Sequence, residues 1–302
     1  MKFAASYSGG KDSTLAIYRA IQQGHTPVLL ITTFNLDRNH SYSHGIDETV
    51  LNRISDSLGI PYLLVKTRDN EYTKDFEKAL LYAKSLGARA CVFGDIDIEG
   101  HFDWCSERCK NTGLEYLFPL WGKDRKSVVY EFIDDGFVAD ISVVNTQYLS
   151  DDFLGRRLTR EIVDSIAEAG ADICGENGEY HTFVSAGPIF KQPVSFAFGE
   201  KIIKEKYAFM LVQDEASNTK QGFKFFNNRA CKYFPCHTAK NPDELNCMFC
   251  FCPLYAMGDK CGGIFIYTEK GVKNCMNCGW PHKPESYDLI MDKLKEWPPG
   301  KC

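Results

Sequence analysis

The first 140 residues alternate short apolar runs with helical segments, and this alternation restricts the fold more than any other feature. Runs rich in apolar and β-branched residues occur at Lys2–Tyr7, Val28–Phe34, Tyr62–Thr67 and Ala90–Phe93. Segments with the apolar spacing of helices lie between them, at Asp12–Gly24, Glu48–Leu58 and Tyr72–Leu86. This order predicts an α/β fold with a parallel sheet and helices on both faces. Ligands bind such sheets beyond the carboxyl ends of the strands, which favours the loop after the first strand.

The later part of the chain predicts fewer regular elements. Leu149–Ala169 has helical spacing, and Gly170–Phe198 is a glycine-punctuated region of loop and strand. Lys201–Gln213 has the composition of a strand, and the polar segment Asp214–Gly222 is the expected linker. Ser286–Trp297 is expected to form a short amphipathic helix near the end of the chain.

Composition excludes several classes of protein. Of the 302 residues, 44% are hydrophobic and 25% are charged, which rules out a disordered or collagen-like chain. No apolar run approaches the roughly 20 residues of a membrane span. The N-terminus lacks the apolar core of a signal peptide, so we expect a cytoplasmic protein. The net charge of −5 disfavours wholesale binding of nucleic acid.

A glycine-rich loop, Ser8-Gly9-Gly10-Lys11-Asp12-Ser13, connects the first expected strand to the first expected helix. Adjacent glycines let backbone N–H groups turn toward an anion, and the helix N-terminus adds partial positive charge. Lys11 adds a full charge, the two serines offer hydroxyl donors, and Asp12 can hold Mg²⁺ against phosphate oxygens. The loop is not a Walker motif, whose glycines are more widely spaced. A turn that only caps a helix does not need these side chains, so we expect a phosphate site.

A second polar segment covers residues 175–184 and reads Gly-Glu-Asn-Gly-Glu-Tyr-His-Thr-Phe-Val. Glu176 and Glu179 can orient an amine or ammonium nucleophile, and His181 can exchange protons near neutral pH. From the pattern alone, a polar turn at Asn177-Gly178 before a strand accounts for the segment equally well.

Both segments resemble known signatures. The loop at residues 8–13 resembles the PP-loop of the N-type ATP pyrophosphatases, a superfamily that includes amide-forming synthetases and tRNA thiolases. Residues 175–184, with Gly187-Pro188-Ile189-Phe190, resemble the signature of the diphthine–ammonia ligase family. Shorter segments that match the same family are Ser43-His44-Gly45, Phe93-Gly94-Asp95-Ile96, Trp104 with Cys109, Gly113-Leu114, Pro119-Leu120-Trp121 and Phe153-Leu154-Gly155-Arg156.

The resemblance covers about residues 1–200. It implies a HUP-type fold and an ATP-dependent carboxylate–ammonia ligase that releases AMP and pyrophosphate. The implied ligands are ATP, Mg²⁺, ammonia and a carboxylate acceptor, such as modified elongation factor 2. Archaeal and eukaryotic members tend to have a second glycine where this chain has Asn177. The form with asparagine resembles bacterial relatives linked to corrinoid salvage, which makes a corrinoid carboxylate the alternative acceptor.

The resemblance also implies three sets of site residues. The expected cofactor-binding residues are Ser8, Gly9, Gly10, Lys11, Asp12, Ser13, His44, Gly94 and Asp95. The expected catalytic residues are Lys11, Asp12, Glu176, Glu179 and His181. The expected substrate-binding residues are Glu176, Asn177, Gly178, Glu179, Tyr180, His181 and Thr182.

Cysteines concentrate near the end of the chain. Eight of 13 lie between Cys231 and Cys278, which in a reducing compartment indicates metal rather than disulfides. Cys247-x2-Cys250 and Cys275-x2-Cys278 can together complete a zinc tetrahedron. Spacing does not choose among the candidates for a second site: Cys231, Cys236, His237, Cys252, Cys261 and His282. We expect two zinc ions in structural sites, with an iron–sulfur cluster as the alternative.

Two other functions stay open. A tRNA thiolase also joins a PP-loop to zinc knuckles, but the acidic first 224 residues argue against it. A non-catalytic nucleotide sensor is disfavoured by the complete Lys11-Asp12-Ser13 set. The oligomeric state, a homodimer included, is also open. The expected organisation is an ATP-binding HUP domain at 1–140, a smaller α+β substrate-binding subdomain at 141–222 and a zinc-ribbon-like, cysteine-rich metal-binding domain at 223–302.

Overall fold

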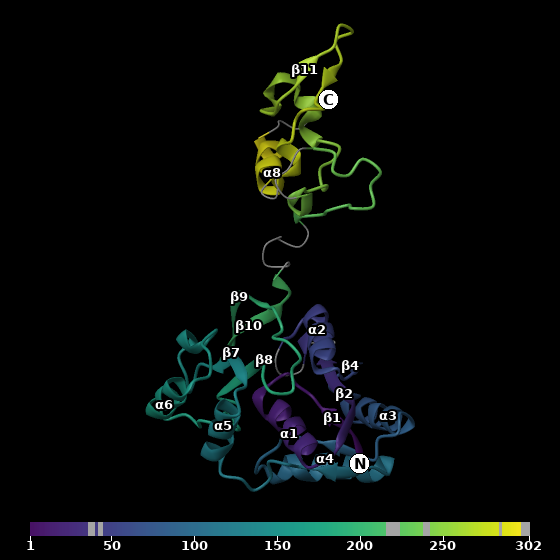
Figure 1. Ribbon diagram of the computed structural model, residues 1–302. Helices are drawn as coiled ribbons and strands as arrows, with labels where there is room; N and C mark the ends of the chain where they lie inside the picture. The colour runs from purple at the N-terminus through teal and green to yellow at the C-terminus, as the bar shows by residue number, and fades with distance from the viewer. Residues whose placement is uncertain (36–39, 42–44, 216–223, 238–241, 284–285, 297–302) are drawn as a thin grey trace. The chain divides into compact units, whose positions relative to one another are not determined.

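A computed structural model describes residues 1–35, 40–41, 45–215, 224–237, 242–283 and 286–296 (Figure 1). Contacts between Cα atoms divide the chain into two units, Met1–Glu215 and Ala216–Cys302. The first unit carries two sheets, and the second carries a short hairpin. None of the helices in these described ranges is long and apolar enough to cross a membrane.

The first sheet is parallel, and its five parallel strands have the order β4-β2-β1-β5-β6. Their bounds are β1 (Lys2–Ser6), β2 (Thr26–Asn35), β4 (Tyr62–Thr67), β5 (Ala90–Val92) and β6 (Glu115–Leu117). A two-residue strand, β3 (His40–Ser41), pairs antiparallel with the end of β2. Successive side chains of a strand face opposite sides, so Phe3 and Ala5 join one buried cluster and Ala4 joins another.

Helices cover both faces of this sheet. On one face, α1 (Lys11–Gln22) and α2 (Glu48–Leu58) contribute to the first cluster. On the other face, α3 (Tyr72–Ser85) and α4 (Glu99–Thr112) contribute to the second. The predicted α/β fold is therefore confirmed.

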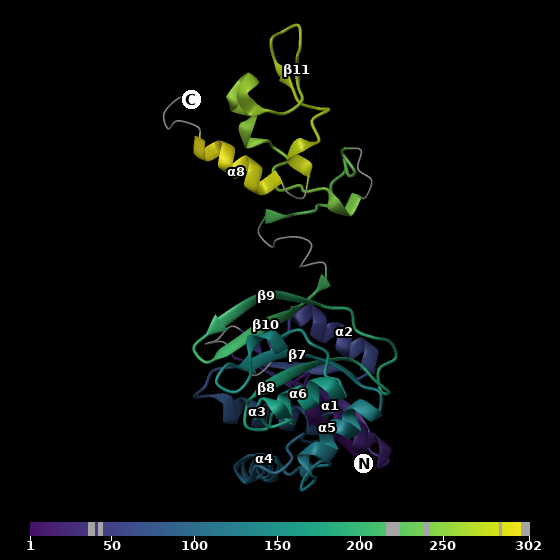
Figure 2. The same ribbon diagram turned by 90° about the vertical axis from the view of Figure 1, so that its left-hand side faces the viewer.

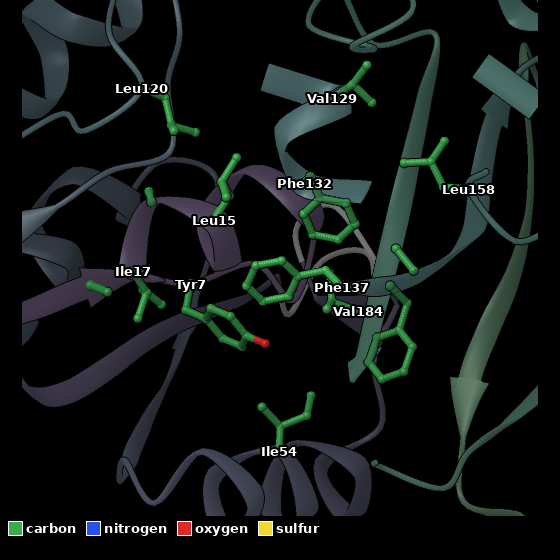
Figure 3. Packing of buried hydrophobic residues seen from close by; sticks show 14 of the residues in the cluster. Tyr7, Leu15, Ile17, Ile54, Leu120, Val129, Phe132, Phe137, Leu158 and Val184 are labelled. Carbon is green, nitrogen blue, oxygen red and sulfur yellow. The ribbon is translucent and has the colours of Figure 1, made fainter. Parts of the chain in front are cut away.

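A second, antiparallel sheet follows α5 (Arg125–Asp134) and has the strand order β8-β7-β10-β9 (Figure 2). Its bounds are β7 (Val138–Asn145), β8 (Tyr180–Ala186), β9 (Ala197–Lys204) and β10 (Tyr207–Gln213). The expected domain boundary between residues 140 and 141 falls inside β7. Figure 3 shows Leu15 of α1, Phe132 of α5 and Val184 of β8 in the same buried cluster. The two sheets therefore share one core.

The helix expected at Leu149–Ala169 is shorter in the structure. Only the 3-10 helix η1 (Asp151–Phe153) and α6 (Arg160–Glu168) form there. Gly155 has a φ of 73°, and the N–H of Ile141 donates to the carbonyl of Arg156 at 2.9 Å. The residues between the two helices therefore pair with β7 instead of completing helical turns.

The single strand expected at Lys201–Gln213 is a hairpin of β9 and β10. The chain reverses at Glu205, which has a φ of 55°. The turn contains neither glycine nor proline, so the usual sequence signal of a reversal is missing.

The C-terminal unit has little regular structure. Its described elements are η3 (Pro242–Glu244), η4 (Pro253–Cys261), β11 (Ile266–Tyr267), β12 (Lys273–Asn274), η5 (Trp280–His282) and α8 (Ser286–Glu296). The buried apolar cluster is small, with Leu254, Cys261 and Ile290 at its centre. The cysteines that the structure describes are all free thiols. A domain with so small a core usually depends on metal ions or disulfides for its stability.

Two expectations fall partly outside the described residues. Of the expected linker Asp214–Gly222, residues 216–222 are not described. The helix α8 confirms the expected helix at Ser286–Trp297 as far as Glu296, and Trp297 is not described.

Candidate active site

A cavity of about 550 Å³ lies at the carboxyl end of the parallel sheet. Ser8 and Gly10–Ser13 line it on one side, and Gly94 and Asp95 after β5 line it on another. Residues 175–178 and 180–182 also line it. The two segments singled out by sequence therefore face one cavity, although they are far apart in the chain.

The phosphate loop has a conformation that requires glycine. Gly9 has a φ of 84°, and a Cβ atom there would overlap the side chain of Ile46. Gly10 is the N-cap of α1 and offers no side chain to its first turn. The hydroxyls of Ser8 and Ser13 lie 3.1 Å apart and close the loop. The arrangement leaves the positive end of α1 at the cavity, where an anion is favoured.

The second segment is bound directly to this loop. The backbone N–H of Lys11 donates to Thr182 Oγ1 at 3.1 Å, across 171 residues of sequence. The N–H of Val184 donates to the carbonyl of Gly9 at 2.9 Å. Lys11 Nζ donates to the carbonyl of Cys174 and, at 2.7 Å, to Asp12 Oδ2. Strand β8 and the preceding loop thus hold Lys11 in place.

Lys11 is buried but remains charged. Burial by itself lowers the pKa of Lys11, but the carboxylate of Asp12 and further acidic neighbours raise it well above the ordinary value. Burial raises the pKa of Asp12, and the ammonium of Lys11 partly offsets this. The site therefore holds the positive charge of Lys11 beside carboxyl groups whose ionisation is opposed by burial.

Glu176 carries a carboxyl group whose pKa is raised toward neutrality. Burial, followed by the charge of Asp12, raises the pKa of Glu176 to about 7. Ligand atoms of Asp12, Cys174 and Glu176 all lie within 4.8 Å of one another. His181 was expected to exchange protons near neutral pH, but burial and Lys11 lower the pKa of His181 to about 4. Its ring is therefore neutral at pH 7.

The second glutamate has a different environment. Glu179 is 4% exposed and is not part of the cavity lining formed by the described residues. Its carboxylate accepts hydrogen bonds from the backbone N–H of Asn177 at 3.1 Å and from Asn177 Nδ2 at 3.2 Å. Glu179 and Asn177 therefore shape the loop that presents Glu176.

Gly94 and Asp95 reach the site from the loop after β5. A Cβ atom on Gly94 would lie 2.7 Å from the backbone carbon of Asp12, so the two loops approach backbone to backbone. Asp95 Oδ1 lies 3.1 Å from Nδ1 of His101 in the first turn of α4. This hydrogen bond raises the pKa of His101. The sequence did not single out His101, which lines the cavity. His44 lies outside the described residues.

Sequence reasoning also missed an ion-pair network behind the cavity. The guanidinium of Arg125 forks onto both carboxylate oxygens of Asp97 at 2.7 Å and also donates to Asp172. Asp172 in turn accepts the backbone N–H groups of Cys174 and Glu176, each at 3.1 Å. Arg125 therefore joins the loop after β5 to the loop that carries Glu176. These residues are widely separated in sequence, so no spacing rule could have found them.

All ten predicted metal ligands line one cavity in the C-terminal unit. Burial and the nearby thiols of Cys250, Cys247 and Cys231 raise the pKa of Cys236. Burial and the nearby thiols of Cys278, Cys261 and Cys275 raise the pKa of Cys252. Cys247 and Cys250 therefore lie near Cys236, and Cys275 and Cys278 lie near Cys252. His237 and His282 lie beside Cys236.

Family models match three consecutive parts of this chain. The diphthamide synthase N-terminal domain matches residues 1–116, and the diphthamide synthase C-terminal domain matches residues 124–217. A cysteine-rich small domain matches residues 222–298. The two domains of one family thus follow each other over most of the chain. The chain belongs to the diphthamide synthase family. The family expected from the sequence is confirmed.

Among the curated relatives, those named diphthine–ammonia ligase agree with this assignment. Diphthine–ammonia ligase of Rattus norvegicus is 25% identical over 242 residues, which cover 69% of this chain and 88% of that protein. The ligase of Homo sapiens is 26% identical over 241 residues, with the same coverage of 69% and 88%. An uncharacterized protein of Methanocaldococcus jannaschii is 37% identical over 71 residues, 23% of this chain and 54% of its own length.

Proposed function

We propose that this chain is an ATP-dependent ligase that joins ammonia to a substrate carboxylate and releases AMP and pyrophosphate. Membership of the diphthamide synthase family and relatives named diphthine–ammonia ligase support ligase chemistry. One structural observation carries the proposal. Lys11 of the phosphate loop is held by Cys174 and Thr182, which flank the loop that carries Glu176, and both loops line one cavity.

In this proposal the phosphate loop binds the β- and γ-phosphates of ATP. Gly9 and Gly10 allow close approach of the backbone, and the N-terminus of α1 supplies favourable electrostatics. The ammonium of Lys11 is already positioned by protein contacts, so it needs little reorganisation when charge develops on the leaving pyrophosphate. Stabilisation by preorganised groups of this kind is usually the largest catalytic contribution.

The residues present fit a magnesium ion. Mg²⁺ prefers carboxylate and phosphate oxygens, and the carboxylate of Asp12, in the phosphate loop, lines the cavity. The thiol of Cys174 is a poor ligand for this hard ion. Asp12 would therefore hold Mg²⁺, which when bound neutralises phosphate charge.

The reaction has two steps. An oxygen of the substrate carboxylate attacks the α-phosphorus of ATP, and the bond from that phosphorus to pyrophosphate breaks. Ammonia then attacks the acyl carbon, the bond to AMP breaks, and the nitrogen releases one proton to solvent to give the neutral amide. Ammonium must lose a proton to become the nucleophile, and Glu176 is placed in the cavity with a pKa of about 7 to accept it. Glu179 and Asn177 hold the loop that positions Glu176.

The test is AMP release from Mg·ATP in the presence of ammonium. Elongation factor 2 that carries diphthine and a set of corrinoid carboxylic acids are compared as acceptors, with no acceptor as the blank. We expect AMP with one of these acceptors, with free ammonium as sufficient nitrogen donor. AMP release that depends on tRNA instead, or strictly on glutamine, would contradict the proposal.

A further inference from the structure

Three potential metal ligands converge in the C-terminal unit. Cys236, His237 and His282 place one sulfur and two imidazole nitrogens within 4.8 Å of one another. His282 ends the 3-10 helix η5, while Cys236 and His237 are adjacent in the chain. The sequence left the second metal site undecided among six residues, and the tertiary structure brings these three together.

The ring of His282 is oriented as a metal ligand would need. Its Nδ1 lies 3.0 Å from the carbonyl oxygen of Asn246, which can only accept, so Nδ1 carries the proton. That leaves the lone pair of Nε2 free. Metal-binding histidines almost always make such a hydrogen bond with the nitrogen that does not bind the metal.

Asn246 is itself fixed. It is fully buried, and its Oδ1 accepts the backbone N–H groups of Phe226 and Met248, each at 3.1 Å. Its own backbone N–H donates to the carbonyl of His282 at 2.8 Å. The orientation of His282 therefore rests on a buried framework.

His237 supplies an independent observation. Its Nε2 is buried and has no hydrogen-bond partner among the described residues. A buried nitrogen without a partner costs free energy, so such atoms usually mark a missing water or ion. The ring of His237 lies 4.3 Å from the ring of His282, centroid to centroid, and its Nδ1 lies 3.2 Å from Cys236 Sγ.

We propose that Cys236, His237 and His282 hold a divalent transition-metal ion. One sulfur with two imidazole nitrogens matches zinc best. The other expected ligands are all thiols: Cys231, Cys247, Cys250, Cys252, Cys261, Cys275 and Cys278. A cysteine-only site and a cysteine–histidine site should therefore differ in their Co²⁺ absorption spectra, and only the second should respond to substitution of a histidine.

The experiment uses the full-length chain and two readouts that do not depend on ligase activity. Metal content per chain is measured by mass spectrometry, and the protein is reconstituted with Co²⁺ for absorption spectroscopy. The variants are His237→Gln and His282→Gln. The matched controls are His25→Gln, in the N-terminal unit, and Cys105→Ser, a buried thiol of α4.

We expect each histidine variant to lose about one equivalent of zinc and to change the Co²⁺ ligand-field bands. Both controls should keep the wild-type zinc content and bands. His282 is buried and its variant can unfold the unit, whereas His237 is only half-buried. His237→Gln therefore tests the site even if His282→Gln does not fold. Wild-type zinc content and spectra in His237→Gln would overturn the proposal, as would inorganic sulfide and iron in the purified protein.

Discussion

Gly94→Ala tests whether the loop after β5 and the phosphate loop must approach backbone to backbone. The added Cβ would lie 2.7 Å from the carbonyl carbon of Asp12 and 2.7 Å from the backbone nitrogen of Ser13. Ordinary contacts between such atoms are about 3.5–4.0 Å, so one loop must move by about 1 Å. The atoms it meets are backbone, which cannot rotate away as a side chain could.

Such a displacement is large for a catalytic loop. Misplacing reacting groups by about 1 Å costs about 100-fold in rate, which corresponds to about 2.7 kcal/mol of transition-state stabilisation. Overpacking itself costs about 1–3 kcal/mol of folding stability. We therefore expect Gly94→Ala to lower kcat/KM for ATP about 100-fold, with weaker ATP binding.

Gly100→Ala is the matched control, since a Cβ there meets nothing within 4 Å. Gly100 lies in the first turn of α4, where alanine is the better helix former, so this variant should be neutral or slightly more stable. ATP binding is measured by calorimetry, turnover by AMP release and folding by thermal unfolding. If Gly94→Ala binds ATP and releases AMP as Gly100→Ala does, the inferred close approach of the loops is wrong.

Four further predictions concern side chains in and next to the site. Lys11→Ala should lower AMP release by about 100-fold or more, because it removes a preorganised charge, and full activity would contradict the assignment of the phosphate loop. Glu176→Gln should lower turnover without lowering Tm, whereas Glu179→Gln should lower Tm, because only Glu179 accepts two hydrogen bonds from Asn177. The pKa of Glu176 is raised from 4.5 to about 7, so the folded protein keeps a proton that the unfolded chain releases in this window. The free energy of unfolding of wild type should therefore fall relative to that of Glu176→Gln as pH rises from about 4.5 to 7. Urea unfolding of both proteins at the two pH values tests this, and a constant difference between them would refute it. Arg125→Lys keeps the charge but loses the fork onto Asp97, so kcat should fall about 10-fold, and unchanged kinetics would show that the network does not position Glu176.

Local sequence determined much of this fold. The alternation of apolar runs and helical spacing predicted β1, β2, β4 and β5 with α1 to α3, because both periodicities are properties of short segments. Glycines predicted the phosphate loop for a similarly local reason, since a positive φ at Gly9 is a property of one residue and its neighbours. The hairpin at Glu205 was missed because no local signal marks its turn.

Tertiary structure decided how the site is assembled. Lys11 meets Cys174 and Thr182 only because β8 packs beside α1, and no spacing rule connects residues 171 positions apart. The same holds for Glu176 and Glu179, which look alike in sequence but differ in burial and hydrogen bonding.

In the cysteine-rich unit, too, composition and tertiary packing determined different properties. Composition alone indicated metal ligands, because thiols and imidazoles in that number and spacing have few other uses. Their grouping depends on how loops with little regular structure cross, so the neighbours of Cys236 are partly distant in sequence. Residue type therefore determined the chemistry that is available, and the packing of segments distant in sequence determined which atoms can act together.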